Sequence, residues 1–308
     1  MATVGLAARR PGLAPTRRLK GLLRGLALLL VVLLAITIVW EGAKFLGGVP
    51  WRAPGAGPGE PVIHDPPFDW AFVNDLNLPH VWNIGVALTE PFERGSDDSL
   101  AVGLFKAALY TWREAGIGFI AGAALGLLLA TVFVHSRLLE RALVPYVIAS
   151  QTIPILALTP VVAFALGRSV LAVVVVATYL TFFPVTIAMI RGLRSFDPRS
   201  LELMRSYAAS PWQIYWKLRL PASLPYLFTA LKISATASIV GAIIGEDVGA
   251  IQEGLGRVIT TFNQYYITGP EKLWAAILFA ALLGGAFFLV VRAIELIVLR
   301  GRPGAAAG

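Results

Sequence analysis

The residue types that carry out catalysis are scarce in this 308-residue chain. It has no cysteine, which excludes a disulfide, a thiolate nucleophile and a Cys-ligated metal centre. It has only three histidines, so a His-rich metal site is not expected: His64, His80 and His135. No Gly-Lys dipeptide occurs, which excludes the GxxxxGK[ST] loop that cradles nucleotide phosphates, and GxSxG and HExxH are absent too. The sequence therefore offers no candidate catalytic centre, and we expect no cofactor or metal bound by this chain.

The polar side chains that could act on a solute lie inside long apolar runs. Gln151 and Thr152 stand among Pro145, Pro154 and Pro160, and prolines free backbone carbonyls in such runs. A buried primary amide needs hydrogen-bond partners that lipid cannot supply. We therefore predict that Gln151 lines a solute pathway, with Thr152 as a weaker candidate.

Thr181 and Lys232 are two further pathway candidates. Thr181 shares a helix face with Thr178, but a threonine can simply bond a carbonyl of its own helix. Lys232 interrupts an apolar run, and we favour a cation that snorkels to the membrane interface over one that contacts solute. No carboxylate is evident inside the apolar runs, so we expect a small polar or anionic solute rather than a cation.

The segment 197–219 combines positive charge with helix-start signals. Asp197-Pro198 is an N-cap followed by proline at the first helical position, which predicts a helix to about Ala209. Ser210 and Gln213 have the spacing of a capping box, which predicts a second helix. On that helix three aromatic residues share one face: Trp212, Tyr215 and Trp216. They fit an interfacial helix at headgroup level or a helix that enters a groove of a cytoplasmic partner, and the pattern leaves both open.

The elements that position these residues are membrane helices. Hydrophobic residues make up 57% of the chain and charged residues 14%, against about 45–50% and about 25% in soluble domains. A soluble enzyme, a disordered region and a nucleic-acid-binding domain are therefore poor fits, despite the net charge of +8. A span needs about 20 apolar residues. Six stretches qualify: Gly25–Trp40, Ala115–Val134, Ala142–Gly167, Ser169–Ile190, Tyr226–Gly245 and Leu273–Val291. The sequence thus predicts an all-α polytopic membrane protein with six transmembrane helices.

Basic residues orient the spans. With a cytoplasmic N-terminus, 17 Lys and Arg fall in inside segments and seven in outside segments. The excess predicts that both termini are cytoplasmic. The expected organisation is a basic segment 1–24, a first span 25–40, an extracytoplasmic loop and lead-in 41–106, a core domain 107–299 that includes 197–221, and a tail 300–308. Within the loop, 47–99 is rich in Pro, Gly and Asp, with little regular structure expected at its start. The first span could instead be a secretory signal, but it is long and no clear Ala-x-Ala site follows.

Small residues recur at helical spacing in two of the spans. Gly118, Gly122 and Gly126 form a tandem GxxxG, and Ser234 and Ser238 begin a similar stripe that continues to Gly245. Such stripes let helix backbones approach closely. We predict that both are packing faces.

The segment 202–221 resembles a known motif. Glu202 is followed by Ala208, then by nine further residues and Leu218-Arg-Leu220-Pro221. This pattern is similar to the EAA loop of ABC-importer permeases. That loop runs EAA, three residues, Gly, nine residues, I-x-L-P. Leu203 and Met204 replace the two alanines, Ala208 replaces the glycine and Leu218 the isoleucine. The preceding Leu-Arg-Ser-Phe-Asp-Pro, the following Leu-Pro-Ala-Ser-Leu-Pro-Tyr, and Gly254-Leu255-Gly256 add to the likeness, which covers roughly residues 100–300.

The resemblance implies a binding-protein-dependent, type I ABC-importer permease. It is similar to the branch that imports nitrate, sulfonates such as taurine, bicarbonate or thiamine-precursor pyrimidines. It implies a bacterial inner-membrane subunit, without catalysis of its own, that pairs with a second permease copy, most simply as a homodimer. The implied partners are an ABC ATPase subunit that uses ATP, an extracytoplasmic solute-binding protein and membrane lipid, but no nucleic acid. It also implies ATPase coupling through Glu202, Ala208, Trp212, Tyr215, Leu218, Leu220 and Pro221.

Two other classes remain as alternatives. An ion-coupled secondary transporter is disfavoured by the apparent lack of acidic residues in the spans and by the absence of inverted repeats. A membrane-integral enzyme is disfavoured by the missing catalytic constellation. The sequence does not name the transported solute.

Overall fold

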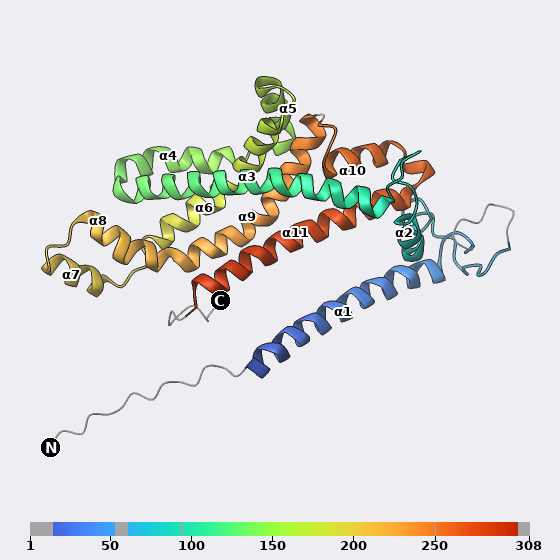
Figure 1. The fold of residues 1–308 in the computed structure, drawn as a ribbon, viewed down its shortest axis with the longest axis horizontal. Coiled ribbons are helices and arrows are strands. Elements are labelled where there is room, and N and C mark those ends of the chain that lie inside the picture. Colours follow the sequence, from blue (N-terminus) through green and yellow to red (C-terminus); the bar gives the residue numbers. More distant parts are fainter. Residues whose placement is uncertain (1–14, 53–60, 94, 250, 301–308) are drawn as a thin grey trace, which may run out of the picture. The chain divides into compact units, whose positions relative to one another are not determined.

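The computed structural model describes residues 15–52, 61–93, 95–249 and 251–300. Most of the predicted basic segment, most of the Pro-Gly-rich patch at 54–61 and nearly all of the tail 300–308 lie outside these residues. The chain divides into two units, residues 1–86 and 87–308. The described residues are predominantly helical (Figure 1), with β-pairing limited to three isolated bridges in the described ranges.

The first unit consists of a long helix and a folded segment that returns to its C-terminal end. Helix α1 (Pro15–Leu46) contains the uncharged run Gly25–Trp40. Lys44 is buried there. Its Nζ donates to Asp75 Oδ1 at 2.6 Å and to the Leu78 carbonyl at 2.7 Å, which offsets the cost of burying the charge. Bridges join Gly47 to Phe68 and Trp51 to His64. In the described residues 47–52 and 61–80, polar contacts and aromatic packing hold the chain, with little regular structure before the short helix α2 (Val81–Ala87).

The second unit is a helical bundle. Three long helices form its centre: α3 (Leu100–His135), α6 (Val170–Gly192) and α9 (Leu220–Gly249). Helix α6 packs against both α3 and α9, and α11 (Pro270–Val298) packs against α9 and α3. Helix α4 (Arg137–Ser150) follows α3 after a single residue and runs beside it (Figure 1). The short helix α10 (Leu255–Gln264) packs against α3, α9 and α11, and the 3-10 turn 266–268 follows it.

Close approach at glycines holds the centre of the bundle together. A methyl group at Gly118, Gly122 or Gly126 would lie within 2.8 Å of a side-chain atom of α6, and one at Gly245 would lie 2.9 Å from the Val173 backbone. Real Cβ atoms are almost never this close to a neighbour, so any larger residue would force the helices apart. The predicted packing role of the GxxxG face and of the α9 stripe is confirmed.

The third expected span is not one straight helix. Helix α4 ends at Ser150 and α5 (Ile155–Leu166) begins after Pro154, with 99° between their axes. Proline fixes its own φ and disfavours the helical conformation at the residue before it, so the helix breaks ahead of Pro154. Pro145 and Pro160 lie within α4 and α5 without breaking either.

The count of six spans is not confirmed. Among the described residues, four helices are long and apolar enough to cross a membrane, and the bent pair of α4 and α5 would make five. The four are α3, α6, α11 and one continuous stretch, Pro211–Val248. Each extends beyond the apolar run that predicted it, since polar residues continue the helical hydrogen-bond ladder past the membrane core.

Candidate functional site

The segment 197–221 lies at the end of the bundle where α3 and α6 also end (Figure 1). Helix α7 (Pro198–Ser206) begins as the sequence predicts: the Asp197 carboxylate accepts a hydrogen bond from the Arg199 N–H at 3.0 Å, and Pro198 takes the first helical position. None of its residues is buried. Helix α7 is therefore a projecting element that contributes little to the bundle core.

A tight turn at Ala208 ends helix α7. The Ala208 N–H donates to the Arg205 carbonyl at 2.9 Å, and the Ala209 N–H donates to the Met204 carbonyl at 3.0 Å. These two bonds form a Schellman motif, in which the residue after the C-cap adopts a left-handed conformation. Ala208 does so with φ of +52°, the only non-glycine positive φ in the described residues. The turn therefore keeps the geometry that glycine provides in the EAA motif, although alanine occupies the position.

The second helix also starts as predicted and then joins a long one. The Gln213 N–H donates to Ser210 Oγ at 3.3 Å and the Ser210 N–H donates to Gln213 Oε1 at 2.9 Å, which confirms the capping box of α8 (Pro211–Ile214). A π turn, Tyr215–Arg219, then leads directly into α9. Pro221 lies inside this continuous helical stretch, Pro211–Val248. The π turn shifts the hydrogen-bond ladder just before the proline, so the helix continues past a residue with no N–H to donate.

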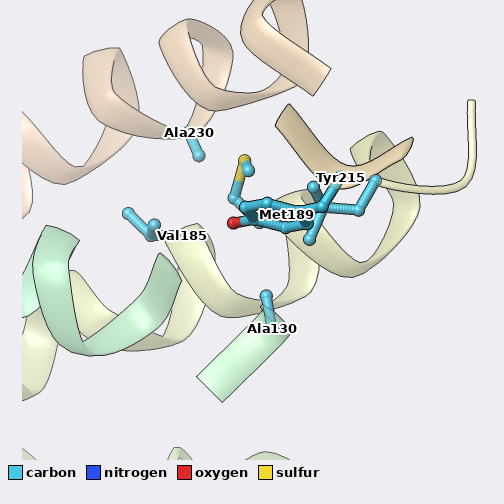
Figure 2. Packing of buried hydrophobic residues seen from close by; sticks show 6 residues of the cluster. Ala130, Val185, Met189, Tyr215 and Ala230 are labelled. Carbon is cyan, nitrogen blue, oxygen red and sulfur yellow. The ribbon is translucent and has the colours of Figure 1, made fainter. Parts of the chain in front are cut away.

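Tyr215 anchors this segment to the bundle. Its side chain is 7% exposed and packs with Ala130 of α3, with Val185 and Met189 of α6, and with Ala230 of α9 (Figure 2). Its hydroxyl lies 2.9 Å from Thr131 Oγ1, which in turn donates to the Leu127 carbonyl. Tyr215 thus connects the base of α8 to α3, α6 and α9.

The flanking side chains face outward. Trp212 is 69% exposed and Trp216 49%, although both rings contact the Tyr215 ring, so the three predicted aromatics divide into one inner anchor and two outer residues. Leu203 and Tyr207 are 58% and 79% exposed. A shallow depression of about 300 Å³ separates the two helices, and its lining is Leu203, Met204, Tyr207, Ala209, Gln213 and Lys217.

The remaining motif residues differ in burial. Glu202 is exposed, and no hydrogen bond or ion pair within the described ranges involves its carboxylate. Leu218, Leu220 and Pro221 are half-buried, and Leu220 packs against the Tyr215 cluster. Glu202 is thus available to another molecule, while Leu220 is part of the packing around Tyr215.

Thr181 and Lys232, two of the four pathway candidates, lie in the long helices and have partners inside the chain. Thr181 is fully buried between helices and donates to the Ala177 carbonyl at 2.9 Å. Lys232 Nζ lies 2.9 Å from Glu295 Oε2, which joins α9 to α11. The Thr181 bond stays within α6, as expected for a threonine in a helix, whereas the Lys232 pair links two helices of the bundle.

Gln151 and Thr152 lie at the bend between α4 and α5. Gln151 is the C-cap of α4, and its buried Nε2 has no hydrogen-bond partner among the described residues. Thr152 is exposed and donates to the Ala149 carbonyl at 2.7 Å. The unpartnered amide keeps Gln151 as the stronger pathway candidate.

Three carboxylates that the apolar runs did not indicate lie inside the long helices. Glu114 of α3 and Glu246 of α9 are 1% and 0% exposed, and Glu295 of α11 pairs with Lys232. They stand at the margins of the apolar runs, where hydropathy alone does not tell whether a helix continues. The expectation that no carboxylate lies within the spanning helices is therefore wrong.

Glu246 explains the Gly254-Leu255-Gly256 sequence. Its Oε2 accepts from the Gly256 N–H at 2.7 Å, and Thr111 Oγ1 of α3 accepts from the Leu255 N–H at 2.9 Å. Two N–H groups at the start of α10 are thereby satisfied by the neighbouring helices. Gly254 has φ of +97°, which L side chains rarely adopt, and a methyl group there would lie 2.3 Å from the Glu246 carboxyl carbon and displace that side chain, so the position favours glycine.

Comparison with known proteins places these features in a family. A family model described as binding-protein-dependent transport system inner membrane component matches residues 122–300. The formylaminopyrimidine transport permease protein of Halalkalibacterium halodurans is 36% identical over 190 residues, 60% of this chain and 73% of that protein. A putative aliphatic sulfonates transport permease protein of Bacillus subtilis is 29% identical over 189 residues, 61% of this chain and 67% of its own length.

Two further similarities concern a nitrate permease and a solved structure. The nitrate import permease protein of Leptolyngbya laminosa is 26% identical over 197 residues, 64% of this chain and 69% of that protein. A chain of the inward-facing MetNI methionine ABC transporter superposes with a TM-score of 0.53 at 22% identity, covering 65% of this chain and 96% of that one. At this identity the likeness shows the fold, that of a type I ABC-importer permease.

Proposed function

We propose a function for this chain from its family, since the chain belongs to the binding-protein-dependent transport system inner membrane components. Members are permease subunits of ABC importers, which are transport components rather than catalysts. The chain is accordingly a multi-pass protein of the bacterial inner membrane.

The proposed assembly contains a second permease copy, an ABC ATPase and an extracytoplasmic solute-binding protein. The permease forms the translocation pathway, binds no cofactor, and leaves ATP hydrolysis to the ATPase. Both termini are cytoplasmic. A cysteine placed at Ser200 should then resist impermeant thiol reagents in sealed cells while one at Ser96 reacts, and the reverse pattern would contradict this orientation.

We propose that the solute is small and polar or anionic. The relatives named above are described as permeases for formylaminopyrimidine, aliphatic sulfonates and nitrate, which supports this class and leaves bicarbonate and taurine within it. The pyrimidine relative has the highest identity of the three, so a thiamine-precursor pyrimidine is the first solute to test. Retention of that pyrimidine by the cognate binding protein would support the choice, and retention of nitrate or a sulfonate instead would overturn it.

The observation that carries the coupling proposal is an exposed segment on a buried anchor. Helices α7 and α8 project Glu202, Leu203 and Trp212 outward, while Tyr215 ties the segment to three bundle helices. An ATPase that holds the exposed side chains can move the bundle through this anchor. Such an arrangement would convert ATPase closure into a change of access across the membrane.

A charge reversal at Glu202 tests this proposal. Glu202→Arg should weaken co-purification with the ATPase or uncouple its hydrolysis from uptake, while the chain still inserts and folds. Glu93→Arg is the matched control, because Glu93 is also exposed and lies outside the segment. If Glu202→Arg assembles and transports like the parent, the coupling assignment is wrong.

Gln151 remains the proposed pathway residue, supported by its unpartnered buried amide at the α4–α5 bend. Gln151→Leu should reduce transport per folded molecule and keep ATPase assembly, since it removes a donor and an acceptor at similar size. A loss of thermal stability with normal transport would instead assign Gln151 to helix packing.

An ion-coupled secondary transporter is the alternative function. Buried Glu114 and Glu246 remove the argument that the spans lack acidic residues. Family membership and the Glu246 contact with α10 favour the importer. Uptake into proteoliposomes that contain the ATPase should require ATP and persist without an ion gradient; dependence on the gradient alone would establish the alternative.

A further inference from the structure

A basic pocket lies at the base of the coupling segment, residues 197–221, which contributes Arg219 to its lining. It encloses about 420 Å³ and is lined mainly by charged side chains of α4, of the turn after α6 and of the π turn: Arg137, Glu140, Arg141, Arg194, Phe196 and Arg219. Four guanidinium groups face one carboxylate, which leaves three positive charges in excess. Arginine stays charged at any physiological pH, so this excess is permanent.

The hydrogen bonds in the pocket leave two of the arginines free. Arg194 makes a two-pronged pair with Glu140, with Nη1–Oε1 at 2.8 Å and Nη2–Oε2 at 2.7 Å. Arg219 lies 5.0 Å from the centre of the Phe196 ring and donates to the Leu193 carbonyl at 3.4 Å. Arg137 and Arg141, one turn apart on α4, form no ion pair with any residue that the structure describes. Their positive charge is available to an external anion.

The pocket lies where three apolar runs end. The runs Ala115–Val134 and Ser169–Ile190 stop just before Arg137 and Arg194, and the run Tyr226–Gly245 begins seven residues after Arg219. Apolar runs that end together mark a membrane boundary, where the phosphate groups of lipids lie.

The surface next to the pocket is apolar. Helix α4 has no buried residue, and its Leu138 and Tyr146 are 78% and 75% exposed. An acyl chain could lie along this helix while its headgroup reaches Arg137 and Arg141. A free anion would make no use of such a surface.

We propose that this pocket binds the phosphate of an anionic phospholipid headgroup. Guanidinium groups form paired hydrogen bonds with phosphate oxygens, which suits arginine better than lysine at this position. Anionic lipids of the cytoplasmic leaflet attract basic side chains by about 1 kcal/mol each. A lipid bound here would link α4 to the base of the coupling segment through Arg194 and Arg219.

The test measures lipid binding to the full chain in detergent. The probe is dioctanoyl phosphatidylglycerol, titrated while bound lipids are counted by mass spectrometry of the intact protein. Dioctanoyl phosphatidylcholine and inorganic phosphate are titrated in parallel. The parent should bind phosphatidylglycerol with clear preference over both. Arg137→Gln with Arg141→Gln should weaken that binding by about tenfold or more, since two attractive charges are lost.

Two further variants separate the site from general effects. Arg191→Gln with Arg300→Gln removes the same charge from exposed positions outside the pocket and should leave binding unchanged. Glu140→Gln removes the only acid of the pocket and should strengthen binding several-fold, an effect that poor folding would not produce. A melting curve of each variant reports its folding.

Four outcomes would overturn the proposal. Equal binding of phosphatidylcholine would show that the headgroup charge is not recognised. Competition by inorganic phosphate at equal concentration would show a free-anion site. An equal loss of binding in the Arg191/Arg300 control would show that the lipid responds to the overall positive charge of the protein and not to the pocket. Unchanged lipid binding with lost ATPase association in the Arg137/Arg141 variant would show that the pocket holds an acidic side chain of a partner.

Discussion

A turn with a positive φ precedes the continuous helical stretch Pro211–Val248 and another follows it, but their surroundings differ. Before α9, Ala208 adopts φ of +52° in an exposed turn. After α9, Gly254 adopts φ of +97° and ψ of 160° in a buried junction, where Glu246 and Thr111 bind the first N–H groups of α10. The exposed turn constrains only the backbone, so a residue with a Cβ is tolerated. The buried junction constrains the backbone and the available space together, so the position favours glycine.

The largest effect is expected at the buried junction. Gly254→Ala should lower the free energy of unfolding by about 3 kcal/mol or more, because the conformation is nearly restricted to glycine and the new methyl would overlap the Glu246 carboxylate. The melting temperature of the purified chain measures the loss. Gly284→Ala is the matched control, since no atom lies within 4 Å of a methyl there, and it should be neutral or stabilising. A Gly254→Ala chain as stable as the parent would refute the claim that space limits this position.

The second-largest effect is expected at Tyr215, which anchors the coupling segment to the bundle. Tyr215→Phe removes the hydroxyl that meets Thr131 Oγ1 and should cost about 1 kcal/mol of stability, as for a typical buried hydrogen bond. If the anchor transmits motion, ATP consumed per solute transported should rise in reconstituted transporter as well. Tyr207→Phe is the control, because that ring is exposed on α7 and no hydrogen bond within the described ranges involves its hydroxyl. Equal effects of the two variants would remove the distinction between anchor and surface.

A buried histidine of the first unit allows the contrast between buried and exposed groups to be tested by pH. Burial holds the pKa of His80 below its ordinary 6.5 and outweighs the hydrogen bond to Glu41, which acts in the opposite direction. The neutral ring donates from Nδ1 to Glu41 Oε2 at 2.8 Å. The unfolded chain therefore binds a proton near pH 6.5 that the folded chain does not.

The contribution of His80 to stability is thus complete above pH 6.5 and decreases as the pH falls toward the folded pKa. We expect a lower melting temperature at about pH 5 than at about pH 7.5, and a smaller difference in His80→Gln. His64→Gln is the control, since that ring is more exposed. A melting temperature of His80→Gln with the same pH dependence as the parent would assign the effect to other groups.

Local signals in the sequence predicted much of this architecture, and contacts over long distances account for the rest. The caps at Asp197 and Ser210 and the close packing at Gly118 depend on neighbouring residues or on simple spacing, and the structure confirms them. The inward position of Tyr215 was not evident, because a set of aromatics at i, i+3 and i+4 gives the same pattern whether the face is buried or exposed. The buried Glu246 was missed for another reason: its partners, Thr111 and Gly256, come from other elements of the chain.

The smallest effect is expected at the exposed turn. Ala208→Gly should raise the stability of the coupling segment by up to about 1 kcal/mol, because it removes the left-handed cost of alanine, although glycine also gains entropy in the unfolded chain. Slower hydrogen exchange at the Ala209 N–H, which bonds to the Met204 carbonyl, would report this local gain better than global melting does. Ala208→Val should have the opposite sign, since a β-branched side chain is poorly tolerated at positive φ. If the Ala209 N–H exchanges at the same rate in the valine variant, the glycine variant and the parent, the turn is not held in the left-handed conformation in solution. The contrast between the exposed turn at Ala208 and the buried junction at Gly254 then disappears.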